Sequence, residues 1–248
     1  MTVHLLAPDD SAYSVNRHVA RIGFLARGEE VSLFEAEAFD DVPLTPDDIV
    51  VGGIKYAARA FERLGWTVPD LDPVPAELRA FAGRNFWRST LADVRRRVSA
   101  GNAVFFKPIP SQPKIFVGSV ARTVGDLIAT ASFDDQIEVD CADVVSFEAE
   151  FRTFVLHGEI IGVRPYKGDP LLFPDPKVIR DAVAAWTDAP AAWSLDVGIT
   201  SDGQTLLVEV NDSYALGAYG LPPLRYAAII DARWQQLRRQ NAGTNNIA

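Results

Sequence analysis

The segments Ser194-Leu195-Asp196-Val197-Gly198 and Leu206-Leu207-Val208-Glu209-Val210-Asn211 decide the fold assignment. Both are apolar runs that predict strands, and the Asp-Gly turn between them predicts a hairpin. Because alternate residues of a strand share a face, Asp196, Glu209 and Asn211 can project together. Two carboxylates and an amide oxygen suit Mg²⁺, which completes its ligand shell with water and phosphate oxygens. The spacing also allows three solvated residues on the outer face of a sheet.

Two lysines lie upstream, at the end of one predicted strand and the start of the next. Lys107 closes Phe105-Phe106-Lys107-Pro108, and Lys114 opens Lys114-Ile115-Phe116-Val117-Gly118. Brought together across the intervening loop, the two ammonium groups would form a cationic patch for a polyphosphate. Each lysine alone is more typical of an ordinary surface charge, and that alternative stays open.

An arginine occupies the middle of a third predicted strand. In 150–156, Glu150, Arg152 and Phe154 share one face. A charged side chain on a central strand is costly unless it is paired, and a bound phosphate or carboxylate would pair it. A neighbouring acid such as Glu150 would serve equally well. Arg164 and Lys167, after the following strand, are interpreted as surface charges that could extend the same patch.

Composition limits the partners and the compartment. The chain has 248 residues, a hydrophobic share of 48% and a charged share of 23%, as in ordinary globular proteins. Its net charge of −9 and pI of about 4.8 argue against nucleic acid and anionic membranes as partners. Cys141 is the single cysteine, and we find neither a signal peptide nor an apolar run of the roughly 20 residues that cross a bilayer. We therefore expect a cytoplasmic protein.

The pattern of elements predicts two kinds of architecture along the chain. An α/β region is expected over 1–100, a strand-rich domain over 101–240, and a flexible tail over 241–248. Helices are expected at 15–27, 56–64, 91–98, 176–187 and 224–239, and strands at 3–6, 30–35, 49–51, 104–106, 114–117, 136–139, 150–156, 159–163, 193–199 and 205–210.

The order of these motifs resembles the ATP-grasp superfamily, and within it the clade named for one arginine and two lysines. The motifs are a Lys-Pro strand, a second lysine before Phe-x-Gly, a Glu-x-Arg-x-Phe-Val strand, and an Asp followed by Glu-x-Asn. The resemblance spans about 50–220, including 78–91, which is similar to the segment before the family's first lysine. It implies an α/β (α+β) class ATP-grasp fold, in which an N-terminal α/β lobe precedes antiparallel-sheet lobes that clamp a nucleotide.

The resemblance also implies a role for individual residues, with ATP and Mg²⁺ as cofactors. Lys107, Lys114 and Arg152 match the catalytic residues that contact phosphate or the acyl-phosphate intermediate. The stretch 141–145 matches the hinge whose backbone contacts adenine, so the implied nucleotide-binding residues are Lys107, Lys114, Asp143, Val144, Val145 and Arg152. The implied metal ligands are Asp196, Glu209 and Asn211.

One departure from the family concerns the residues before the first metal-binding aspartate. Many members have an arginine there, whereas this chain has Ser194 and Leu195. Arg152 or Arg164 would have to supply that charge.

The function implied by the resemblance is an ATP-dependent carboxylate–amine ligase that acts through an acyl phosphate on amino acids or a peptide. The expected partners are therefore small-molecule or peptide substrates, and a homodimer is compatible with the sequence. Two alternatives stay open on the same fold, an ATP-binding regulatory module and a phosphotransferase that does not ligate.

Overall fold

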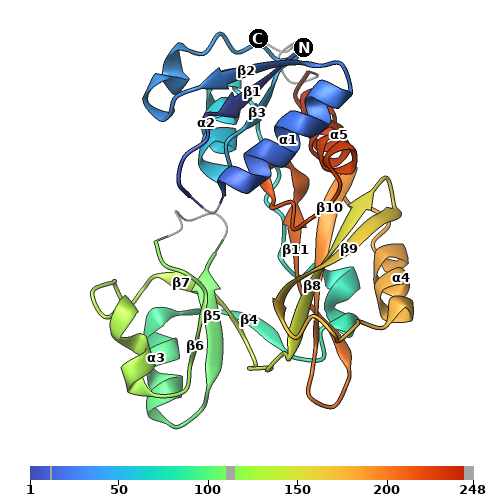
Figure 1. Ribbon diagram of the computed structural model, residues 1–248. Helices are drawn as coiled ribbons and strands as arrows, with labels where there is room; N and C mark the ends of the chain where they lie inside the picture. The colour runs from blue at the N-terminus through green and yellow to red at the C-terminus, as the bar shows by residue number, and fades with distance from the viewer. Residues whose placement is uncertain (12, 110–114, 243–248) are drawn as a thin grey trace.

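The N-terminal lobe is built on a parallel sheet in the order β2-β1-β3 (Figure 1). The computed structural model describes residues 1–11, 13–109 and 115–242. The lobe's strands and helices are β1 (Thr2–Leu6), α1 (Ser14–Ala26), β2 (Glu30–Phe34), β3 (Ile49–Val51) and α2 (Ile54–Leu64). β1 and β3 are almost wholly buried, as expected for parallel strands covered by helices. The helices and strands predicted for this lobe are confirmed to within two residues.

The last helix of the chain, α5 (Pro223–Ala242), returns to this lobe and packs along α1. Its Trp234 and Leu237 are buried in the same apolar core as Phe24. Asn241, where we expected a flexible tail to begin, is helical and buried. Its amide accepts from the Thr67 backbone N–H at 2.8 Å and donates to the Thr67 carbonyl at 3.1 Å, which anchors the helix end. The rest of the expected tail, 243–248, lies outside the described residues.

A small antiparallel sheet in the order β4-β7-β5-β6 forms the second lobe. Its elements are β4 (Phe86–Thr90), α3 (Leu91–Ser99), β5 (Val104–Pro108), β6 (Ser119–Ala121) and β7 (Glu138–Ala142). The sequence pattern predicts a boundary between domains near residue 100. β4 and α3 precede that residue, yet both belong to the second lobe. β4 was not predicted as a strand, and the strand expected at 114–117 is wrong for 115–117, which are irregular.

The third sheet has the order β11-β10-β8-β9 and is antiparallel throughout. Its strands are β8 (Ala149–Leu156), β9 (Glu159–Gly168), β10 (Ala192–Ile199) and β11 (Thr205–Asp212). A two-residue turn joins β8 to β9, and both its residues, His157 and Gly158, have positive φ, as tight hairpins favour. One face of the sheet packs on α4 (Pro176–Ala185) through an apolar cluster. The opposite face carries the polar side chains described below.

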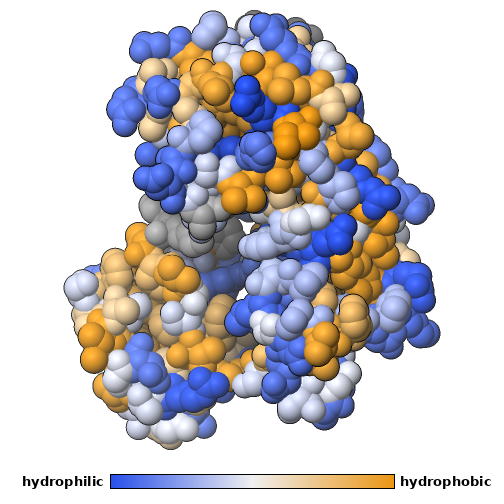
Figure 2. Space-filling model, in the orientation of Figure 1, coloured by the Kyte–Doolittle hydropathy of each residue, from blue (hydrophilic) through white to orange (hydrophobic). Residues whose placement is uncertain are grey.

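The two antiparallel sheets lie side by side below the N-terminal lobe (Figure 1). The space-filling view shows a hollow where the three lobes meet (Figure 2). β4 crosses from the second lobe toward the third sheet. No helix in the described part of the chain has the length and apolar character needed to span a membrane.

Candidate active site

A row of charged side chains crosses all four strands of the third sheet. Glu209 on β11 lies opposite Asp196 on β10, Asp196 lies opposite Arg152 on β8, and Arg152 lies opposite Arg164 on β9. Directly opposed residues of antiparallel strands project to the same face. The row therefore has an acidic end at β11 and a basic end at β9.

The two central members of the row form a buried ion pair. Arg152 donates from Nε to Asp196 Oδ1 at 2.8 Å and from Nη2 to Oδ2 at 2.6 Å, and the side chains are 9% and 2% exposed. Burial raises the pKa of Asp196 to about 6, although the Arg152 hydrogen bonds act in the opposite direction. Glu150, the alternative partner suggested by the sequence, instead accepts from the Tyr166 hydroxyl at 2.7 Å and from Lys167 at 2.5 Å.

The acidic end of the row forms a second ion pair, which bridges two lobes. Lys107, at the end of β5, donates from Nζ to Glu209 Oε2 at 2.8 Å. The two side chains are 24% and 34% exposed, so this pair is open to solvent. Burial alone would raise the pKa of Glu209, but Lys107, together with Arg152 and Asn211, outweighs burial and holds the pKa below its ordinary value.

The three predicted metal ligands come together on this face. Asn211 Nδ2 donates to Asp196 Oδ2 at 3.2 Å, and Glu209 lies directly opposite Asp196. Their oxygens are the hard donors that suit Mg²⁺. Both oxygens of Asp196 already accept from Arg152, so Glu209 is the more accessible carboxylate of the two. Within the described residues, no group of three or more His, Cys, Asp and Glu side chains is arranged to hold a metal ion. The metal assignment therefore stays a prediction.

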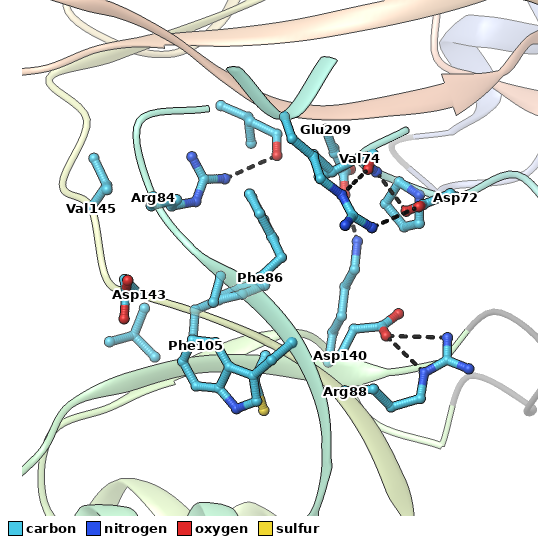
Figure 3. A pocket seen from close by; sticks show the side chains of 18 of the residues that line it. Asp72, Val74, Arg84, Phe86, Arg88, Phe105, Asp140, Asp143, Val145 and Glu209 are labelled. Atoms are coloured by element: carbon cyan, nitrogen blue, oxygen red, sulfur yellow. Dashed lines mark hydrogen bonds and ion pairs between the residues drawn. The ribbon is translucent and has the colours of Figure 1, made fainter. Parts of the chain in front are cut away.

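A cavity of about 650 Å³ separates the second and third sheets and contains the Lys107–Glu209 pair in its wall. A volume of this order suits a ligand of nucleotide size. Figure 3 shows Glu209 on one side of the cavity and Asp140, which pairs with Arg88, on the other. The apolar part of the lining consists mainly of Phe86, Trp87, Phe105, Val120, Val145 and Phe147.

The predicted hinge lies along one wall of this cavity. Asp143 and Val145 line it, together with Cys141 at the end of β7. The Asp143 carboxylate accepts from Asn85 Nδ2 at 2.7 Å, so this side chain ties the hinge to the segment before β4. No hydrogen bond with another described residue engages the backbone of Val144 or Val145. Those backbone groups are available to a ligand, and the role of Asp143, Val144 and Val145 in binding adenine remains a prediction.

Sequence reasoning missed Arg84, which positions the strand beside the cavity. It donates from Nη1 to the Leu207 carbonyl at 2.7 Å and from Nη2 to the Val208 carbonyl at 3.0 Å. Its guanidinium carbon lies 4.8 Å from the centroid of the Phe86 ring. Arg84 thus holds β11 next to Glu209. The only signal in the sequence was its position within the stretch 78–91.

Two tyrosines that surround Arg152 were also missed. Its guanidinium carbon lies 4.9 Å from the centroid of Tyr219 and 5.9 Å from that of Tyr166. Their positions depend on tertiary packing and have no sequence motif. The predicted phosphate ligand Lys114 lies outside the described residues.

A nucleotide-sized cavity between two antiparallel sheets, with lysine and carboxylates at its edge, defines a nucleotide-using enzyme. A family model matches residues 81–229, which is more than half of the chain, and it describes the ATP-grasp domain of family 2 in the clade named for one arginine and two lysines. The chain belongs to this family. Membership confirms the predicted superfamily and fold class.

Solved structures of the same fold cover nearly the whole chain. D-alanine–D-alanine ligase from Bacillus anthracis, complexed with ATP, is 14% identical with a TM-score of 0.59, over 97% of this chain and 99% of that chain. D-cycloserine synthetase DcsG is 12% identical with a TM-score of 0.59, over 96% and 100%. ATP-grasp ligase PsnB, complexed with its minimal precursor, is 13% identical with a TM-score of 0.53, over 93% and 99%. Among curated proteins, no sequence match was found.

Proposed function

We propose that this protein joins a carboxylate to an amine with ATP as the energy source, through an acyl-phosphate intermediate. The observation that carries the proposal is the charged row, which starts at the wall of the cavity with Glu209 and continues to Arg152. A nucleotide in the cavity would place its phosphates toward Lys107 and Glu209. A substrate carboxylate beside Arg152 would then lie next to the terminal phosphate.

The chemistry proceeds in two balanced steps. A carboxylate oxygen of the substrate attacks the γ-phosphorus of ATP, the bond from this phosphorus to the β–γ bridging oxygen breaks, and ADP leaves. The amine nitrogen then attacks the acyl carbon, the carbon–oxygen bond to phosphate breaks, and inorganic phosphate and a proton are released. Positioning and charge neutralisation supply most of the catalysis in such transfers.

The proposal gives each predicted site residue a task. Lys107 and Lys114 hold phosphate oxygens, and the backbone at 143–145 holds adenine against the apolar wall. Arg152 binds the reacting carboxylate and the acyl phosphate. It thereby supplies the positive charge that many family members obtain from an arginine before the first metal-binding aspartate. Mg²⁺ held by Glu209, Asn211 and Asp196 would neutralise charge on the phosphates.

Amino acids or a peptide are the substrates that we propose. In support, the solved structures of similar fold include a ligase of D-alanine and one complexed with a precursor. The size of the cavity and the acidic character of the chain are compatible with both kinds of substrate.

An ADP-release screen tests this function. Wild-type protein with ATP and Mg²⁺ is offered pairs of amino acids and short peptides, and Glu209→Gln is the matched negative control. We expect ADP release that requires Mg²⁺ and a carboxylate substrate, with an amide product when an amine is added. ATP binding without substrate-dependent ADP release would indicate the regulatory module instead. Accumulation of a stable phosphorylated product without an amide would indicate the phosphotransferase.

A further inference from the structure

The basic end of the charged row has no partner among the described residues. Arg164 lies directly opposite Arg152 and shares its face of the sheet. Arg152 is neutralised by Asp196, whereas no carboxylate in the described part of the chain forms an ion pair with Arg164. Its Nε is buried and has no hydrogen-bond partner there. A buried donor without an acceptor costs about 1–3 kcal/mol, and a bound anion would remove that cost.

Arg164 lies at the opposite end of the row from the nucleotide-sized cavity. Three strand spacings of about 4.8 Å separate it from Glu209, which is roughly 14 Å. It does not line the cavity that we assign to ATP. Arg152 stands between the two, one strand spacing from Arg164. The backbones of Arg152 and Arg164 are thus one strand spacing apart, about 5 Å, and both side chains project from the same face of the sheet.

A strained turn covers this end of the row. The Ala218 carbonyl accepts from the Leu221 N–H at 2.8 Å, and the intervening Tyr219 and Gly220 have φ of 43° and 78°, as in a type I′ turn. A tyrosine in the left-handed region costs about 1–2 kcal/mol. A Cβ added to Gly217 would lie 3.0 Å from the Tyr219 ring, so the absence of a side chain at Gly217 leaves space for the ring.

The ring of Tyr219 covers the guanidinium of Arg152 and lies 5.3 Å from the ring of Tyr166. Tyr219 and Tyr166 therefore flank the guanidinium of Arg152, next to the basic end of the row. Hydrogen bonds from a guanidinium to a carboxylate are charge-assisted and stronger than neutral ones. The basic end of the row therefore suits a carboxylate.

We propose, building on the function proposed above, that the phosphorylated substrate carries two carboxylates, as an acidic amino acid does. One carboxylate reacts beside Arg152, and the other is bound by Arg164. Arg152 retains N–H donors beyond the two that Asp196 accepts. One strand spacing between the two arginines is of the order of a short carbon chain that joins two carboxylates. Arg164 is then a specificity-determining residue.

Matched acid and amide pairs test the proposal. Aspartate and glutamate, in both chiral forms, are compared with asparagine and glutamine in the ADP-release assay with Mg²⁺. We expect kcat/KM to be at least tenfold higher for one of the acids than for its amide. Equal kcat/KM for the acid and its amide, or for a monocarboxylic amino acid such as alanine, would overturn the proposal.

Substitution of Arg164 is the second test of the proposal. Arg164→Gln should raise the KM for the acidic substrate at least tenfold and leave the KM for ATP unchanged, and Arg164→Lys should recover part of the loss. Substitution of the exposed Arg180 on α4, Arg180→Gln, is the control for the change in net charge. An unchanged KM for the acid in a folded Arg164→Gln variant, or a raised KM for ATP instead, would contradict the assignment.

Calorimetry separates this proposal from the proposed function. Aspartate and glutamate are titrated into wild type and Arg164→Gln in the presence of Mg²⁺ and a non-hydrolysable ATP analogue. Binding to wild type alone, without ADP release in any assay, would support the subsite and contradict ligation. ADP release with monocarboxylates alone, and no binding of either acid, would support ligation and contradict the subsite.

Discussion

Two ion pairs lie next to each other on one face of the third sheet, and they differ in the elements that they join and in their exposure to solvent. Arg152–Asp196 joins neighbouring strands within one sheet, with side chains 9% and 2% exposed. Lys107–Glu209 joins two lobes across the cavity, with side chains 24% and 34% exposed. The first pair has been removed from water, whereas the second still contacts it.

The difference separates a pair whose interaction supports the fold of the site from a pair whose members can exchange partners when a ligand binds. Breaking a buried pair leaves an uncompensated charge, while an open pair contributes little to stability and can exchange partners at low cost. Asp196 therefore fixes Arg152 in place, and Glu209 and Lys107 are free to bind a metal and phosphate. Asp196 and Glu209 had looked equivalent in the sequence.

The largest effect should follow from removing Asp196. Asp196→Ala leaves the Arg152 guanidinium buried without a partner, and we expect a loss of about 3–5 kcal/mol in the free energy of unfolding, measured by urea denaturation. The double variant Arg152→Met/Asp196→Leu should recover most of this stability but no activity. A loss below about 1 kcal/mol in Asp196→Ala would show that the two pairs are energetically alike.

Glu209 should show the opposite behaviour. Glu209→Gln should change the free energy of unfolding by less than about 1 kcal/mol, because the Lys107–Glu209 pair is partly open to solvent. It should nevertheless reduce Mg²⁺-dependent ADP release about 10²–10³-fold, the range seen when one charge-stabilising group is removed. Unfolding and steady-state assays on the same preparation measure both. A strongly destabilised but active variant would reverse the roles of the two pairs.

A smaller effect is expected at Tyr219. Asparagine tolerates the left-handed conformation, so Tyr219→Asn should raise the free energy of unfolding by about 0.5–1 kcal/mol while kcat/KM falls, because Arg152 loses its aromatic cover. Thermal denaturation and steady-state kinetics check the two changes. Loss of stability together with activity would mean that the ring serves packing alone.

The smallest effect concerns Cys141 on the hinge side of the cavity. Burial raises the pKa of its thiol to about 12, so the unreactive protonated form dominates at pH 7 to 9. We expect iodoacetamide to modify the folded protein far more slowly than free cysteine, and urea to remove the difference. Rapid modification at pH 7.5 without unfolding would show that the hinge opens to solvent.

Sequence patterns predicted the regular elements where local periodicity was strong. The helix around Leu91–Ser99 and the hairpin β10–β11 are confirmed, because apolar spacing and turn residues specify them locally. β4 was missed because its residues are half-buried and lie between a glycine turn and a helix, without alternation. Its pairing with β7 depends on residues 48 to 56 positions away.

For the site, the sequence supplied the residues but not their partners. Asp196, Glu209 and Arg152 were all recognised, and the register of the strands brings them into one row. Which acid pairs with Arg152 depended on that register and on burial, since Glu150 lies two residues away on the same strand yet pairs with Lys167. Arg84 and Tyr219 act through contacts between distant segments, so no local pattern could indicate them.

The most direct test of the account follows one oxygen atom. If the reaction passes through an acyl phosphate, a substrate carboxylate labelled with ¹⁸O must transfer one labelled oxygen to inorganic phosphate during amide formation. Mass spectrometry of the released phosphate should therefore find one ¹⁸O per turnover in wild type, with labelled phosphate formed about 10²–10³-fold more slowly by Glu209→Gln. Unlabelled phosphate alongside normal product formation would contradict the acyl-phosphate ligase proposed for this fold.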